Sequence, residues 1–95
     1  MQMEYGLPLF VPRTKADAER SLQYAQEIMD REPYRAKFAV EEFIEIYNSL
    51  GVEVPPEARQ LEAEIGKKCE AYTGNVDFSR LKQLIADLRL FNKGS

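Results

Sequence analysis

Apolar side chains recur every three or four residues along most of this chain, a spacing that predicts amphipathic α-helices. Four such segments are separated by helix-ending signals, and we expect helices near residues 15–31, 33–50, 56–72 and 78–91. The connections between them are short, which favours antiparallel neighbours. The pattern therefore predicts an all-α fold, a compact antiparallel bundle of about four helices.

Residues that favour helix ends support these boundaries. Thr14, followed three residues later by Asp17, indicates an N-cap with an acidic first turn. Pro33 suits the first turn of the second helix, and Gly51 suits the left-handed position just after it. Asp77 can cap the fourth helix in the same way as Thr14 caps the first.

The predicted helices differ in the width of their apolar faces. The second helix is apolar over nearly half of its circumference, so we expect it to be the central helix. The third helix has only a narrow apolar stripe and should be peripheral. This stripe consists of Ala58, Leu61, Ile65, Cys69 and Tyr72. On the fourth helix, the helical spacing assigns Phe91 to a broad buried stripe and leaves Leu90 outside it.

Residues 1–13 do not follow a helical pattern. Pro8 and Pro12 push the residues before them toward extended geometry, and large apolar side chains lie between them, Leu9 and Phe10 among them. We expect an extended apolar N-terminal arm over 1–13, followed by one helical domain over 14–93. Packing on its own bundle or on a twin is favoured over free exposure, since exposed apolar side chains promote aggregation.

Composition removes most catalytic and metal-binding chemistry. The 95 residues include no histidine and one cysteine, which excludes Ser-His and Cys-His nucleophiles and His-ligated zinc. A single thiol cannot form a four-cysteine cluster. Its place in the narrow stripe of the third helix indicates that Cys69 is packed and unreactive. We propose no catalytic residue and expect no cofactor.

A run of glutamates is the one remaining candidate for chemistry. Glu41, Glu42 and Glu45 resemble the EExxE opening of the all-α nucleotide pyrophosphohydrolases, which implies Mg²⁺ bound by helix-borne carboxylates. Those enzymes also use a downstream ExxD. None of the glutamates between positions 57 and 70 is followed at the third position by aspartate. An ordinary solvated acidic face is the favoured interpretation.

The charge and hydropathy of the chain limit the classes of partner that we expect it to bind. The net charge is −3, yet residues 78–95 hold four basic residues and one acidic one. Lys82 and Arg89 lie seven residues apart on one side of the fourth helix, where they could contact an anion or an acidic partner. The net negative charge of the chain disfavours binding to nucleic acid. No segment has the length and apolarity of a membrane span, and Glu4 precedes any basic residue, unlike a secretory signal. We expect a cytoplasmic protein.

Two aromatic residues fall on the wrong side of the second helix. Tyr34 and Phe38 are four residues apart and lie among the glutamates, opposite the broad apolar face. Either another part of the chain covers them, or they anchor a contact with a partner or a second subunit.

These observations favour a small non-enzymatic helical protein that acts through protein–protein interaction, such as an adaptor, an inhibitor, an immunity-type protein or a regulatory subunit. Tyr34, Phe38, Leu9 and Phe10 are its expected partner-binding residues, and a homodimer is the expected assembly. The alternative is a Mg²⁺-dependent nucleotide hydrolase that uses the glutamate run. A third hypothesis is the sequestration of a small ligand or nucleotide between subunits.

Overall fold

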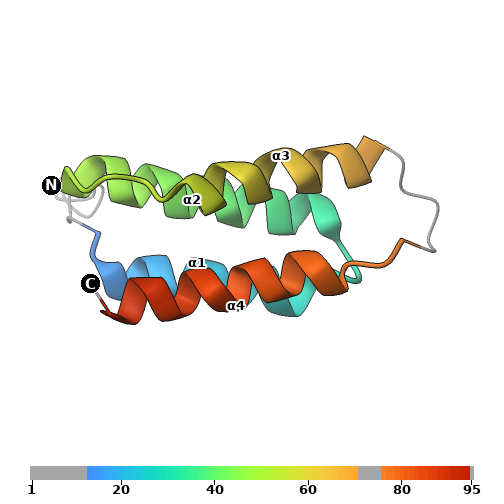
Figure 1. Ribbon diagram of the computed structural model, residues 1–95, viewed down its shortest axis with the longest axis horizontal. Helices are drawn as coiled ribbons and strands as arrows, with labels where there is room; N and C mark the ends of the chain where they lie inside the picture. The colour runs from blue at the N-terminus through green and yellow to red at the C-terminus, as the bar shows by residue number, and fades with distance from the viewer. Residues whose placement is uncertain (1–12, 71–75, 95) are drawn as a thin grey trace, which may run out of the picture.

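The computed structural model describes residues 13–70 and 76–94, which form a bundle of four helices (Figure 1). The helices are α1 (Lys15–Ile28), α2 (Pro33–Leu50), α3 (Pro56–Glu70) and α4 (Ser79–Gly94). The predicted all-α antiparallel bundle is confirmed. The expected arm lies outside the described residues except for Arg13, so Leu9 and Phe10 have no described position.

The helices occupy the four corners of the bundle. α1 packs against α2 and α4, and α3 packs against the same two helices. Figure 1 shows α2 and α3 as one pair and α1 and α4 as the other. The prediction that α2 is a central helix is therefore wrong, because α2 has two helical neighbours like every other helix. Its wide apolar face packs against both α1 and α3. The buried residues of α2 are Pro33, Ala36, Ala39, Val40, Phe43, Ile44, Ile46 and Tyr47.

The start of α1 and the end of α2 follow the predicted signals. Asp17 Oδ2 accepts a 2.8 Å hydrogen bond from the backbone N–H of Thr14, which satisfies a donor at the start of α1. Gly51 has a φ of 72°, the left-handed conformation expected after α2. The backbone N–H of Val52 then donates to the carbonyl of Tyr47 at 3.1 Å, which closes the helix.

Two boundaries differ from the prediction by about one turn. α1 ends at Ile28, and the carbonyl of this residue accepts backbone hydrogen bonds from Arg31 and Glu32 in the turn toward α2. At the other end of the chain, α4 continues to Gly94. Asp77 Oδ1 accepts a 2.9 Å bond from the N–H of Ser79, so the predicted cap is present at the start of α4.

The apolar stripe of α3 agrees with the prediction, whereas that of α4 agrees only in part, and Leu50, expected on the apolar face of α2, is exposed. Ala58, Leu61, Ile65 and Cys69 of α3 are buried as expected, while Tyr72 lies outside the described residues. Leu90 is exposed, as expected. The prediction that Phe91 is buried is wrong, because its side chain is exposed. Asn92 occupies the inward position next to it, because its amide is bonded to α1 and α2 inside the bundle.

None of the four described helices has the length and apolarity needed to cross a membrane.

Candidate functional site

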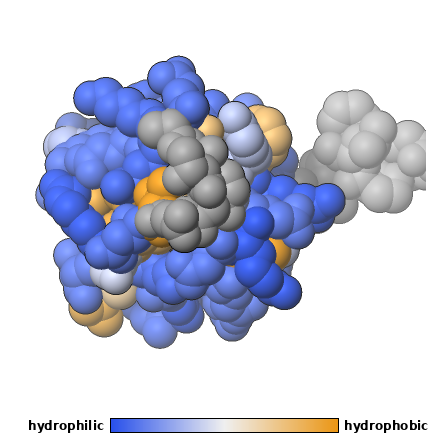
Figure 2. Space-filling view, turned by 90° about the vertical axis from the view of Figure 1, so that its right-hand side faces the viewer, coloured by the Kyte–Doolittle hydropathy of each residue, from blue (hydrophilic) through white to orange (hydrophobic). Residues whose placement is uncertain are grey.

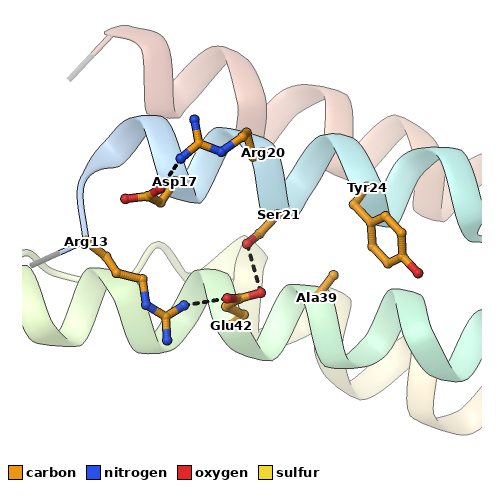
Figure 3. Close-up of a pocket in the computed structure, with 7 residues that line it drawn as sticks. All are labelled: Arg13, Asp17, Arg20, Ser21, Tyr24, Ala39 and Glu42. Atoms are coloured by element: carbon orange, nitrogen blue, oxygen red, sulfur yellow. Dashed lines mark hydrogen bonds and ion pairs between the residues drawn. The ribbon is translucent and has the colours of Figure 1, made fainter. Parts of the chain in front are cut away.

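A shallow groove runs between α1 and α2, and two of the candidate residues singled out in the sequence, Phe38 and Glu42, line it. One part of it, of about 250 Å³, is lined by Arg13, Asp17, Arg20, Ser21, Tyr24, Ala39 and Glu42 (Figure 3). An adjoining part, of about 280 Å³, shares three of these residues and adds Arg35 and Phe38. We call the two parts together the α1–α2 groove.

The first part of the groove is polar and its charges are paired. Glu42 of α2 is ion-paired with Arg13 and accepts a 3.2 Å hydrogen bond from the hydroxyl of Ser21 on α1 (Figure 3). On α1, Arg20 is ion-paired with Asp17. The pKa of Asp17 lies below its ordinary value, first because the Thr14 backbone N–H donates to it and also because Arg20 is close. The carboxylates of Glu42 and Asp17 therefore connect neighbouring parts of the chain through ion pairs and hydrogen bonds.

The second part of the groove is aromatic. Phe38 is 60% exposed and Tyr24 of α1 is 42% exposed, and both line this part. Arg35 lies with them, and its pKa is raised by a side-chain hydrogen bond with Tyr24 and by the charge of Glu32. Tyrosine and arginine are among the residue types most enriched in protein-binding hot spots, and phenylalanine is enriched in the cores of interfaces.

Tyr34 lies on the α3 side of the same helix surface. Its side chain is 56% exposed, and its hydroxyl donates a 3.4 Å hydrogen bond to the backbone carbonyl of Cys69. The Nζ of Lys37 lies 5.8 Å from the centroid of the Phe38 ring, within reach of a cation–π contact. Tyr34 and Phe38 therefore share the outer surface of α2, and the Tyr34 hydroxyl also ties α2 to α3.

The structure does not gather the glutamate run into a metal site. Glu41 is ion-paired with Lys37 at 3.0 Å on the α3 side of α2, whereas Glu42 turns to Arg13 and Ser21 at α1. Glu45 is exposed. Within residues 13–70 and 76–94, no group of three or more acidic, histidine or cysteine side chains is arranged to hold a metal ion. Helical spacing directs neighbouring glutamates to different sides, which separates these carboxylates.

Lys82 and Arg89 already have acidic partners within the chain. Lys82 is ion-paired with Asp30, and Arg89 Nε lies 2.7 Å from Glu19 Oε2. The guanidinium of Arg89 also donates a 2.8 Å bond to Gln26. The basic face of α4 thus holds this helix against α1. These ion pairs give two of the basic residues of the C-terminal segment acidic partners within the chain.

The thiol of Cys69 is packed as expected. It is buried, and this burial raises its pKa, although the nearby charge of Lys37 acts in the opposite direction. A raised pKa disfavours the reactive thiolate at neutral pH.

Tyr24 is not among the candidate residues singled out in the sequence, although this aromatic residue lines both parts of the groove. Its helical position places it at the border of the apolar face of α1, and border positions next to a second helix line grooves. Its proximity to Phe38 depends on how α1 and α2 pack, so the sequence of α1 alone does not reveal it.

Comparison of this chain with models of protein families, with curated proteins and with solved structures finds no match.

Proposed function

We propose that this chain is a non-enzymatic helical protein that acts by binding another polypeptide through the aromatic part of the α1–α2 groove and the adjoining outer surface of α2. The observation that carries the proposal is the exposure of Phe38, Tyr34 and Tyr24 on adjoining surfaces of the bundle. Adaptors, inhibitors, immunity-type proteins and regulatory subunits all act in this way. No catalytic residue and no cofactor form part of the proposal.

The core of the bundle does not need these three rings. The apolar positions of all four helices already pack inside it, with Phe43 and Tyr47 of α2 among the largest buried side chains. When a partner covers large apolar side chains that are exposed together, their burial makes a favourable contribution to the free energy of binding. Such rings commonly anchor interfaces and lie inside a polar rim.

The surroundings of the rings have the character of such a rim. Arg35, Glu42 and Glu45 are all exposed around them. Seen from the end where α1 turns into α2, the surface is mostly hydrophilic, and its hydrophobic spots are small and separate (Figure 2). Leu9 and Phe10 of the N-terminal segment belong to the proposal as additional contacts. Lys82 and Arg89 do not, because Lys82 is ion-paired with Asp30 in the turn after α1 and Arg89 with Glu19 of α1.

Photo-crosslinking tests this function directly. A photoreactive phenylalanine analogue at position 38 replaces a ring with a similar ring, so the fold should be preserved. The control carries the analogue at position 90, because Leu90 is 70% exposed but lies on α4. We expect irradiation of cells of the native host to give covalent adducts with a polypeptide from position 38, and few from position 90.

Equal adduct yields from both positions would contradict the proposal, since they would show that exposure alone decides the reaction. The absence of a polypeptide adduct from position 38 would contradict it as well.

A further inference from the structure

The described part of the chain begins at one end of the α1–α2 groove. Arg13, the first described residue, lines the polar part of the groove and is ion-paired with Glu42 of α2. Figure 3 shows Arg13 at one end of this part and Tyr24 at the other. The N-terminal arm therefore joins the bundle beside the groove, and Pro12, directly before Arg13, favours the turn that leads into it.

Small side chains leave room in the groove for larger ones. Ser21 of α1 and Ala39 of α2 both line its first part, which has a volume of about 250 Å³ (Figure 3). The exposed rings of Tyr24 and Phe38 flank its second part, of about 280 Å³. A groove with a small floor and apolar flanks suits an extended segment that carries large apolar side chains.

The apolar residues of the arm lie at matching distances from Arg13. The two prolines of the arm favour extended geometry, which advances about 3.1 Å per residue. Phe10 and Leu9, three and four residues before Arg13, would lie about 9 and 12 Å along the groove, over its small floor. Leu7 would lie about 19 Å along it, next to Tyr24 at about 16 Å, because α1 rises about 1.5 Å per residue.

The charges at the far end of the groove complete this match. Glu4 is the one charged residue among residues 1–12, and it would lie about 28 Å from Arg13. α1 ends about 22 Å from Arg13, and Arg31 follows in the turn. The side chain of Arg31 is exposed and has no ion-pair partner within residues 13–70 and 76–94. An extended arm therefore brings its carboxylate to a cation that is free to pair with it.

We propose that the N-terminal arm binds in the α1–α2 groove of its own chain, antiparallel to α1. Its apolar side chains cover the small floor and the aromatic part of the groove, and Glu4 pairs with Arg31. A partner polypeptide then binds only when it displaces the arm, and the displaced Leu9 and Phe10 are free to contact that partner. This regulation rests on the proposed function, whereas the binding of the arm does not.

A second exposed apolar surface near Arg13 fits the arm less well. It lies at the end of the bundle where α1 begins (Figure 1), and its residues are Leu50, Val52 and Phe91. A cavity of about 170 Å³ beside Phe91 is lined by Glu57 and Asp87 as well. These carboxylates repel the charge of Glu4 and offer it no cation, so charge complementarity favours the groove.

A photoreactive phenylalanine analogue at position 10 of the purified full chain tests this arrangement. The analogue replaces one ring of the arm with a similar ring. Irradiation should give an intramolecular crosslink, at the monomer mass of 11.0 kDa, in a yield that does not change on dilution. Tandem mass spectrometry should locate this crosslink within residues 17–24 of α1 or 38–42 of α2.

Three outcomes of this experiment would overturn the proposal. A crosslink to Leu50, Val52 or Phe91 would show that the arm covers the end of the bundle instead. Products of twice the monomer mass would show that the arm binds a second copy of the chain. The absence of any crosslink within the chain would show that the arm does not bind the bundle.

Exchanging the charges at the far end tests the direction of the arm. Glu4→Lys and Arg31→Glu each place like charges opposite each other, and each should lower the yield of the position-10 crosslink about two- to fivefold, the range of an exposed ion pair. The double variant restores opposite charges and should restore the yield. Arg59→Glu, at an exposed arginine of α3, is the control and should leave the yield unchanged. Single variants without effect, or a double variant without recovery, would overturn the antiparallel arrangement.

The failure of this proposal can be distinguished from the failure of the proposed function. If position 38 gives adducts with a second polypeptide in cells but position 10 does not crosslink into the groove, the arm is placed wrongly and the proposed function stands. If position 10 crosslinks into the groove but position 38 gives no such adduct in cells, the arm binds as proposed and the function is wrong.

Discussion

The hydroxyl of Tyr47 on α2 donates a 2.7 Å hydrogen bond to Oδ1 of Asn92 on α4, inside the bundle. The Nδ2 of the same asparagine donates a 3.0 Å bond to the backbone carbonyl of Lys15 at the start of α1. One buried amide thus joins three helices at one end of the fold. Such a link specifies the register of the helices, since an apolar contact would tolerate sliding.

Replacing Tyr47 with phenylalanine removes one donor from this link while it keeps the ring. We expect Tyr47→Phe to lower the free energy of unfolding by about 1–3 kcal/mol, because a buried polar group loses its partner. Urea unfolding followed by circular dichroism measures this loss. Tyr24→Phe, the same change at an exposed tyrosine, is the control and should change the free energy by less than about 0.5 kcal/mol. Equal losses would show that the Asn92 bond contributes nothing.

The local part of the fold could be predicted from the sequence, because its signals are local. Thr14 with Asp17, Gly51 and Asp77 each act on residues within a few positions, and each appears where expected. The narrow stripe of α3 follows from helical periodicity alone. The position of Asn92 could not be predicted in this way. It is polar and lies near a helix end, and it faces inward because it accepts a hydrogen bond from Tyr47, 45 positions away in the sequence.

The candidate site could be predicted only in part, for the same reason. The exposure of Phe38 follows from its position opposite the apolar face of α2. The roles of Lys82 and Arg89 depend on which segments face α4, and the sequence alone could not assign their partners, Asp30 and Glu19. The glutamate run forms one motif in the sequence, but Glu41 pairs with Lys37 of its own helix while Glu42 contacts Ser21 of α1 and Arg13 of the segment before it.

Arg89 should matter more for stability than the other basic residues of α4. Its partner Glu19 is largely shielded from solvent, and Glu19 Oε1 is buried without a hydrogen-bond partner among the described residues. Arg89→Leu leaves this carboxylate without its cation, and we expect a loss of about 1–3 kcal/mol in urea unfolding. Lys82→Leu at the more exposed pair with Asp30 should cost at most about 1 kcal/mol.

A double variant separates the pair from the packing around it. Glu19→Leu combined with Arg89→Leu should recover most of the loss, because it removes the uncompensated carboxylate along with the cation. A double variant that is less stable than Arg89→Leu would show that the carboxylate has a further stabilising role.

Gly66 offers a stabilising substitution in the middle of α3. A Cβ added there would lie 3.5 Å from Cε of Lys37, an ordinary van der Waals contact. Gly66→Ala should therefore raise the free energy of unfolding by up to about 1 kcal/mol, the difference in helix propensity. Gly51→Ala is the matched control: its surroundings are open, but its φ of 72° should make the same change cost about 1–2 kcal/mol. Thermal unfolding measures both changes.

Cys69 should react with a thiol reagent slowly in the folded protein and rapidly in denaturant. The side chain is buried and burial raises its pKa, so both access and thiolate formation are reduced. Cys69→Ser places a hydroxyl in the same apolar position and should cost about 1–3 kcal/mol in unfolding free energy. Fast labelling of the native chain would contradict this, and it would show that α3 opens readily.

The pH dependence of the free energy of unfolding should reflect the titration of the Glu62 carboxyl group. Burial raises its pKa, and a hydrogen bond with Glu41 adds to the effect, while Lys37 opposes it. A raised pKa in the folded state means that folding favours the protonated form. This contribution is present below the pKa of an unfolded glutamate, about 4.3, and is lost as the pH rises through the folded value.

Glu62→Gln keeps the shape of this side chain and removes its titration. Unfolding by urea between about pH 3 and pH 7 should show the variant gaining stability relative to the original chain as the pH rises. Asp17→Asn is the control of opposite sign, because the pKa of Asp17 is lowered, first by its bond from the Thr14 backbone. A lowered pKa adds stability above the unfolded value, so this variant should lose stability relative to the original chain as the pH rises. Parallel pH profiles for the two variants would contradict both assignments.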